Sequence, residues 1–175
     1  SGRADDPVEL SLDRIRQLAA HEVGHALGFG HNFAASSNDR ASVMDYPAPW
    51  IDVVDERLDF RRAYDHGIGA WDIASARWLY TEFEPGVDEA VALDAILEQA
   101  FGDGLQYIAD EHGRATGTAH PDASVWDNGE DAVEELRRTL AVRAHALERF
   151  GPDRIAMGRP GAELREGLVP IYLYH

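Results

Sequence analysis

The sequence predicts a mainly α-helical protein of 175 residues, and two observations support this fold class. First, apolar residues recur at helical spacing in four segments, at residues 11–27, 69–80, 88–101 and 130–150. Second, glycine and proline separate these segments, and only residues 105–109 have the character of a short strand. We therefore expect a helix and a long loop early in the chain, followed by a helical C-terminal region.

The composition excludes several classes of function. The chain has 32 acidic and 16 basic residues, which gives a net charge of -16 at pH 7. This charge argues against binding to nucleic acids or to anionic membranes, because both would repel the protein. The chain has no cysteine, so disulfides, thiol catalysis and cysteine-ligated zinc are excluded. Any metal site must use histidine and carboxylate ligands.

The first predicted helix covers residues 11–27. Ser11 is a candidate N-cap, because serine side chains accept hydrogen bonds from the first free N–H groups of a helix. An apolar stripe follows, formed by Leu12, Ile15 and Leu18. The stripe predicts that this side of the helix is buried.

The end of this helix carries histidines and a glutamate at the spacing of a catalytic zinc site. Residues four apart lie on one helical face about 6 Å apart, so His21 and His25 can ligate one ion. Glu22 lies beside this pair and is placed to take a proton from a water that the metal activates. Gly28 lacks a Cβ and can turn the chain, which allows His31 to return as the third ligand.

A second motif, Ser42-Val43-Met44-Asp45-Tyr46-Pro47, follows in the predicted loop. Alone, Met44 would be core filling. With the three-histidine helix before it, the motif resembles the metzincin zinc endopeptidases, in which a methionine turn lies beneath the metal. The resemblance implies that Met44 supports the site and that the Tyr46 hydroxyl stabilises the transition state. The alternative for Tyr46 is a loop tyrosine packed on Pro47 or Pro49.

Further segments narrow the resemblance and extend it over nearly the whole chain. They are Asn32-Phe33-Ala34-Ala35-Ser36, Tyr107-Ile108-Ala109-Asp110, His120-Pro121, Trp126-Asp127-Asn128-Gly129 and Leu168-Val169-Pro170-Ile171-Tyr172-Leu173-Tyr174-His175. Together they resemble the large bacterial zinc-dependent metalloproteases whose catalytic region is called a Met-zincin domain. The resemblance implies a zinc helix, a methionine turn and a following helix in residues 1–80, and a helical C-terminal subdomain in residues 81–175. We expect the N-terminal sheet of a complete metzincin to be absent from this chain.

The function implied by the resemblance is a zinc-dependent endopeptidase region, with Zn²⁺ as cofactor and a peptide or protein as substrate. Such proteins are periplasmic, bound to the cell surface or secreted, which implies an extracytoplasmic location. The chain itself has no signal-peptide pattern and no apolar run of the roughly 18 residues that span a membrane. Because it begins shortly before the zinc helix, we expect it to be a piece of a longer protein.

Other functions stay open. The chain can be a metal-binding or interaction fragment without activity in isolation, since a zinc helix without its covering sheet exposes apolar surface and can self-associate. It can also be a zinc hydrolase with a non-peptide substrate. Glu22 favours catalysis, because a structural zinc site needs no base. A second metal site built from Asp110, His112, His120 and Asp122 is a weaker alternative, since their spacing matches no metal motif.

Overall fold

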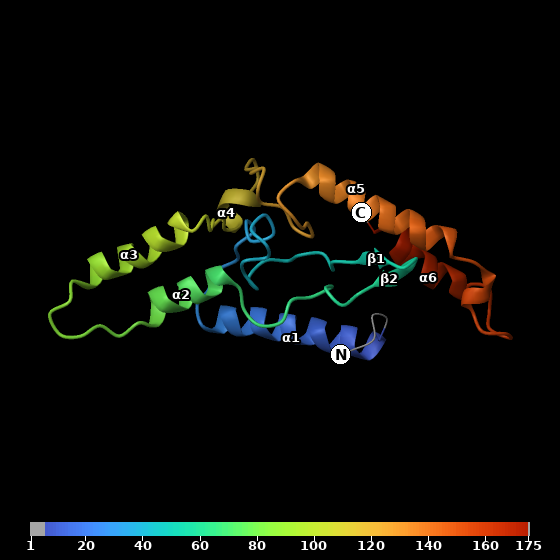
Figure 1. Cartoon of the computed structure of the whole chain (residues 1–175), viewed down its shortest axis with the longest axis horizontal. Coiled ribbons are helices and arrows are strands. Elements are labelled where there is room, and N and C mark those ends of the chain that lie inside the picture. The colour runs from blue at the N-terminus through green and yellow to red at the C-terminus, as the bar shows by residue number, and fades with distance from the viewer. Residues whose placement is uncertain (1–5, 175) are drawn as a thin grey trace.

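The computed structural model describes residues 6–174, and this part of the chain is mainly α-helical, as predicted. Within residues 6–174, six α-helices and one two-stranded sheet are joined by long irregular segments. Figure 1 shows an elongated molecule, with α2 and α3 at one end and α5 and α6 at the other. No helix of residues 6–174 combines the length and apolar character that a membrane span needs. His175, the last residue of the segments that resemble a Met-zincin domain, lies outside the described residues.

Helix α1 spans Pro7–Ala26 and carries the first part of the candidate site. It begins earlier than predicted because Asp6 is the N-cap and Pro7 occupies the first turn. The Asp6 Oδ1 atom accepts a hydrogen bond from the Val8 N–H at 2.9 Å. The prediction of Ser11 as N-cap was therefore wrong. Its hydroxyl donates to the Pro7 carbonyl oxygen at 2.7 Å, inside the helix.

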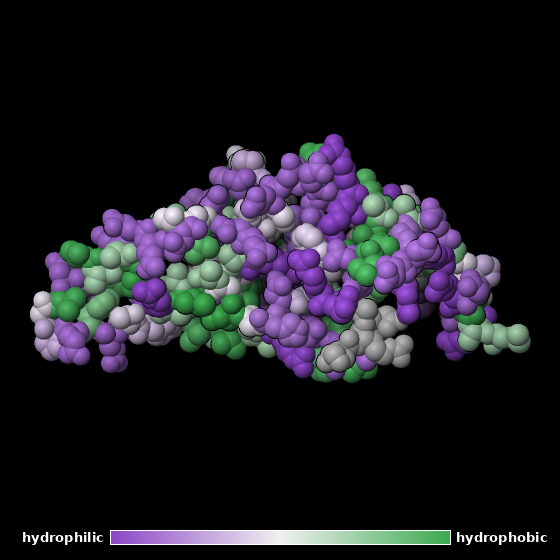
Figure 2. Space-filling view, viewed as in Figure 1, coloured by the Kyte–Doolittle hydropathy of each residue, from purple (hydrophilic) through white to green (hydrophobic). Residues whose placement is uncertain are grey.

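The buried face of α1 is not its apolar face. Its buried residues are Gln17, His21 and Gly24, whereas Ile15 is 61% exposed and the rest of the predicted stripe is exposed as well. The expected burial of this stripe was wrong, because α1 packs its opposite side against the loop that follows the third histidine. Figure 2 shows apolar atoms at the surface where α2 and the C-terminal end of α1 lie. Self-association through such a surface stays a prediction.

Helices α2 (Ala70–Tyr80) and α3 (Glu89–Gly102) pack against each other and confirm two predicted helices. Trp71 of α2 and Ala100 of α3 belong to one buried cluster together with Ala35 and Ala41. This cluster attaches the helical end of the molecule to the irregular segment that contains the candidate site.

Helices α5 (Ala132–Glu148) and α6 (Glu163–Tyr172) form the other end, with a short 3₁₀ turn at Pro152–Arg154 between them. Helix α5 confirms the helix predicted at residues 130–150. Before it lies a one-turn helix, α4 (Asp110–Gly113). The strand predicted at residues 105–109 does not form, since these residues belong to no β-ladder.

A small hairpin was not expected from the sequence pattern. Strand β1 (Asp52–Val54) pairs antiparallel with β2 (Arg57–Asp59). The two turn residues, Asp55 and Glu56, have φ values of 50° and 60°. Positive φ at both turn positions matches the twist that a two-residue hairpin requires.

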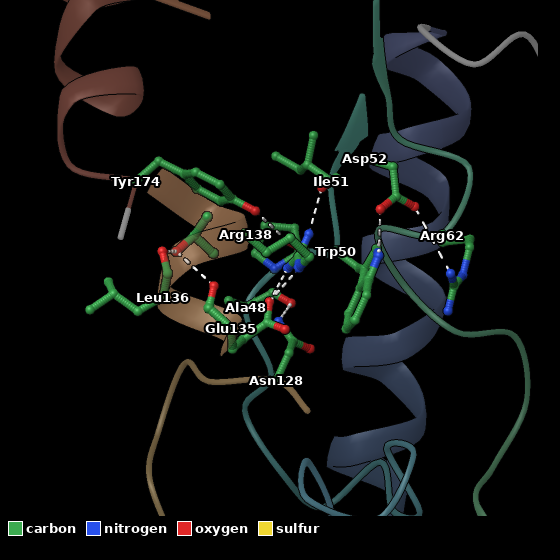
Figure 3. A network of polar contacts seen from close by, with 12 residues as sticks. Ala48, Trp50, Ile51, Asp52, Arg62, Asn128, Glu135, Leu136, Arg138 and Tyr174 are labelled. Atoms are coloured by element: carbon green, nitrogen blue, oxygen red, sulfur yellow. Dashed lines mark hydrogen bonds and ion pairs between the residues drawn. The ribbon is translucent and has the colours of Figure 1, made fainter. Parts of the chain in front are cut away.

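A polar network joins α5 to residues 48–52 (Figure 3). The Arg138 guanidinium lies 3.9 Å from the centroid of the Trp50 ring, and its Nη1 donates to the Ile51 carbonyl oxygen at 2.6 Å. The Asn128 side chain donates to the Ala48 carbonyl oxygen at 3.0 Å. Both Arg138 and Asn128 lie in the C-terminal half of the chain. They hold in place the backbone that leaves the predicted methionine turn.

Candidate metal centre

Three histidines meet at one point of the structure. Potential ligand atoms of His21, His25 and His31 all lie within 4.8 Å of one another. His21 and His25 come from successive turns of α1, and their ring centroids are 4.7 Å apart. The chain turns at Gly28, where φ is +93°, a conformation that glycine adopts without strain. This turn brings His31 back, with its ring centroid 4.7 Å from that of His25.

The alternative metal site does not form. Among residues 6–174, the three histidines are the one group of three or more histidine, aspartate or glutamate side chains that could hold an ion. Asp110, His112, His120 and Asp122 are not gathered into such a group. Asp110 instead contacts the three-histidine cluster.

Backbone carbonyls determine the tautomers of the two histidines on α1. His21 Nδ1 lies 2.7 Å from the Val43 carbonyl oxygen, and His25 Nδ1 lies 3.0 Å from the Phe29 carbonyl oxygen. A carbonyl oxygen can only accept, so each Nδ1 carries a proton and each Nε2 keeps a lone pair. This is the form in which a neutral imidazole binds a metal through Nε2.

His31 has a carboxylate as its partner. Its Nδ1 lies 2.6 Å from Asp110 Oδ2, and its Nε2 lies 3.0 Å from the Tyr46 hydroxyl. The carboxylate accepts the Nδ1 proton, and the hydroxyl donates to Nε2. Asp110 is 79 positions away in the chain. No local spacing indicated this pair, although Asp110 belongs to one of the segments that resemble a Met-zincin domain and was also a candidate for the alternative site.

The donor set fits a zinc ion. His21 Nε2 is buried and has no hydrogen-bond partner among the described residues. A buried acceptor without a partner costs about 1–3 kcal/mol, which a ligand at this atom would offset. Burial also lowers the pKa of His21, which keeps the ring neutral near pH 7. Three neutral imidazoles form a ligand set typical of catalytic zinc sites.

Met44 lies against the histidine helix. Its side chain is 1% exposed and packs on Gly24 of α1. A Cβ atom at position 24 would lie 2.3 Å from the Met44 Sδ, so glycine is what allows the helix and the loop to approach this closely.

Helix α2 orients a histidine through the same loop. Asp72 is 2% exposed and accepts hydrogen bonds from the Ser42 hydroxyl at 2.6 Å and from the Val43 N–H at 2.8 Å. The Val43 carbonyl oxygen contacts His21, and Asp72 holds the backbone at Val43. Asp72 therefore helps to fix the position of the His21 ring. No local spacing indicates this role of Asp72, since its partners lie about 30 residues away.

The two predicted catalytic side chains lie beside the histidines. Glu22 follows His21 on α1 and is exposed to solvent. The Tyr46 ring centroid lies 4.7 Å from that of His21 and 5.0 Å from that of His31. Tyr46 therefore faces the histidine cluster with its hydroxyl.

Comparison with protein families agrees with this geometry. A family model described as Met-zincin matches residues 3–175. The chain belongs to the Met-zincin family. The family and the histidine cluster together indicate a zinc metalloprotease-like region. No curated protein and no solved structure shows significant similarity to the chain.

In this Met-zincin, Asn32 brings the start of α4 to the metal centre. Asn32 is fully buried, its Nδ2 donates to the Gln106 carbonyl oxygen at 2.8 Å, and its Oδ1 accepts from the Ile108 N–H at 3.0 Å. The Phe33 N–H donates to the Ile108 carbonyl oxygen at 2.9 Å. These bonds replace the strand pairing expected for residues 105–109 and place Asp110 beside His31.

A buried carboxylate lies behind the methionine turn of this Met-zincin. Asp45 is 3% exposed and accepts from the Tyr46 N–H at 2.7 Å and the Ser36 N–H at 2.9 Å. Burial raises the pKa of Asp45 to about 7, and the nearby Asp127 contributes to the rise. Burial also raises the pKa of Asp127.

Proposed function

We propose that this region is a zinc-dependent endopeptidase that hydrolyses peptide bonds. His21, His25 and His31 hold the ion through Nε2, and Gly28 and Met44 support their arrangement. The observation that carries the proposal is a contact shared by the three histidines: each Nδ1 lies within hydrogen-bond distance of an oxygen of the protein, so Nε2 is the ring nitrogen left for the ion.

Glu22 acts as the general base in this proposal. A bound zinc ion supplies Lewis acidity, which makes a water molecule more acidic and polarises a carbonyl oxygen. The Glu22 carboxylate takes the proton from the attacking water and gives it to the leaving amine. Its solvent exposure on α1 keeps it accessible to both.

Tyr46 donates a hydrogen bond to the oxyanion. Its hydroxyl lies 3.0 Å from His31 Nε2, close to the point where the histidines converge. Because that nitrogen has one lone pair, binding of a metal at His31 requires the hydroxyl to leave it. The freed O–H can then donate to a substrate oxygen.

Substitution of the general base tests the proposal in the full-length protein. Glu22→Gln should retain zinc and reduce peptide cleavage by about 10²- to 10⁴-fold. Metal analysis and cleavage of casein and a peptide library measure the two effects. The matched control is Glu9→Gln, an exposed carboxylate on the same helix, which should keep full activity. Undiminished cleavage by Glu22→Gln would remove Glu22 from this role.

The same assays separate the other candidate functions. Wild-type protein that binds zinc but cleaves no peptide would instead be a metal-binding or interaction region, to which the exposed apolar face of α1 is suited. Hydrolysis of esters or amides outside peptides, without peptide cleavage, would indicate a non-peptide hydrolase.

A further inference from the structure

Asp110 differs from the groups that hold the other two histidines. His21 and His25 donate to backbone carbonyls, which are neutral and belong to residues 43 and 29. His31 donates to a side-chain carboxylate, at a distance of 2.6 Å. A hydrogen bond to a carboxylate is stronger than one to a carbonyl, and it increases the electron density on the opposite ring nitrogen.

The position of Asp110 is determined by contacts on both sides. Upstream, the buried Asn32 holds residues 106 and 108. Downstream, Arg114 on the next turn lies 3.9 Å from Asp110 Oδ1, on the oxygen that does not contact the histidine. The Arg114 guanidinium in turn lies over the Phe33 ring, with 5.4 Å between its carbon and the ring centroid. One carboxylate oxygen thus faces His31, and the other faces a cation.

We propose that Asp110 is the positioning residue of the third zinc ligand. It holds His31 in the Nδ1–H tautomer and makes its Nε2 a stronger metal donor. The segment that leads to α4 is therefore part of the metal centre, although it follows the zinc motif by more than 70 residues. This inference rests on the proposed binding of zinc by the three histidines.

Zinc affinity is the first measurement. Metal-free wild-type, Asp110→Ala and Asp110→Asn proteins are titrated with Zn²⁺ against a fluorescent chelator. Asp110→Ala should bind zinc about 10- to 100-fold more weakly. Asp110→Asn should lie between it and wild type, because its amide oxygen still accepts from Nδ1–H but carries no charge. The matched control is Glu111→Gln, the exposed neighbouring carboxylate, which should bind zinc as wild type does.

The tautomer of His31 is the second measurement, and it needs no metal. Long-range ¹H–¹⁵N spectra of the zinc-free proteins report which ring nitrogen carries the proton. His31 should be in the Nδ1–H form in wild type and a mixture of both forms in Asp110→Ala, while His21 stays unchanged. Far-UV circular dichroism shows whether each variant keeps its helices, so that a misfolded variant is recognised and replaced by Asp110→Asn.

The outcomes separate this inference from the proposed function. Wild-type zinc affinity or an unchanged His31 tautomer in Asp110→Ala would overturn the role of Asp110. An equal loss of affinity in Glu111→Gln would also overturn it, since the effect would then be one of overall charge. If wild-type protein binds no zinc, the proposed function fails, and the tautomer spectra still decide whether Asp110 positions His31.

Discussion

The irregular segment of residues 31–47 and the long helices α3 and α5 contrast in structure and in burial. The segment contains no helix or strand, yet residues 32–36 are all buried. Helix α3 buries only Ala100, and α5 buries only Thr139 and Val142. Regular structure and burial are therefore largely separated in this molecule, and the candidate metal centre lies where helix α1 meets the buried, irregular segment.

Backbone hydrogen bonds explain this difference. A helix satisfies its own N–H and C=O groups and can lie at the surface. A buried loop has no regular ladder of backbone hydrogen bonds, so side chains must provide many of the partners. Asn32, Asp45 and Asp72 do this for residues 32–46 and for the segments that touch them. We expect substitutions of such side chains to cost more than substitutions in the helices.

The largest effect is expected for Asn32→Ala. The change leaves the buried N–H groups of Ile108 and Ala34 without their acceptor, at about 1–3 kcal/mol for each group, and removes the donor to the Gln106 carbonyl oxygen. Urea unfolding should show a total loss of about 3 kcal/mol. Asn38→Ala is the matched control, because this asparagine also donates to a carbonyl, that of Gly104, but at an exposed site. Equal losses in the two variants would contradict the contrast between buried loop and surface.

Gly24→Ala should have an intermediate effect. The new Cβ would lie 2.3 Å from the Met44 Sδ, and Met44 is too buried to move away freely, so a loss of about 1–3 kcal/mol is expected. Gly102→Ala provides the comparison on α3, where a Cβ would meet nothing within 4 Å. Alanine there should stabilise the protein through its higher helix propensity, by at most about 0.5 kcal/mol because Gly102 is the last residue of α3. Thermal unfolding of both variants measures whether stability falls in Gly24→Ala and rises in Gly102→Ala. A change in the same direction in both variants would contradict this expectation.

How much of the fold and of the candidate metal centre could be predicted depends on how far apart the interacting residues lie in the sequence. The helices and the gathering of His21, His25 and His31 depend on residues a few positions apart, and their spacing indicated both. The pair of His31 and Asp110 and the contacts of Asn32 join segments more than 70 residues apart, so no local pattern reveals them. The apolar stripe on α1 was misleading for a different reason: in residues 6–174 it stays at least partly exposed, and the face that carries Gln17 and His21 is buried instead.

The last comparison concerns the pH dependence that the buried carboxyl group of Asp45 adds to stability. Because its pKa is raised from 3.8 to about 7, the folded protein binds more protons than the unfolded chain between these values. Stability should therefore fall as pH rises through this interval, by at most about 1.4 kcal/mol per pH unit from this group. Asp45→Asn removes the titrating group, so the slope of unfolding free energy against pH should become less negative than in wild type. Parallel slopes for the two proteins would mean that Asp45 stays ionised in the buried loop, where the N–H groups of Ser36 and Tyr46 would then outweigh the effect of burial.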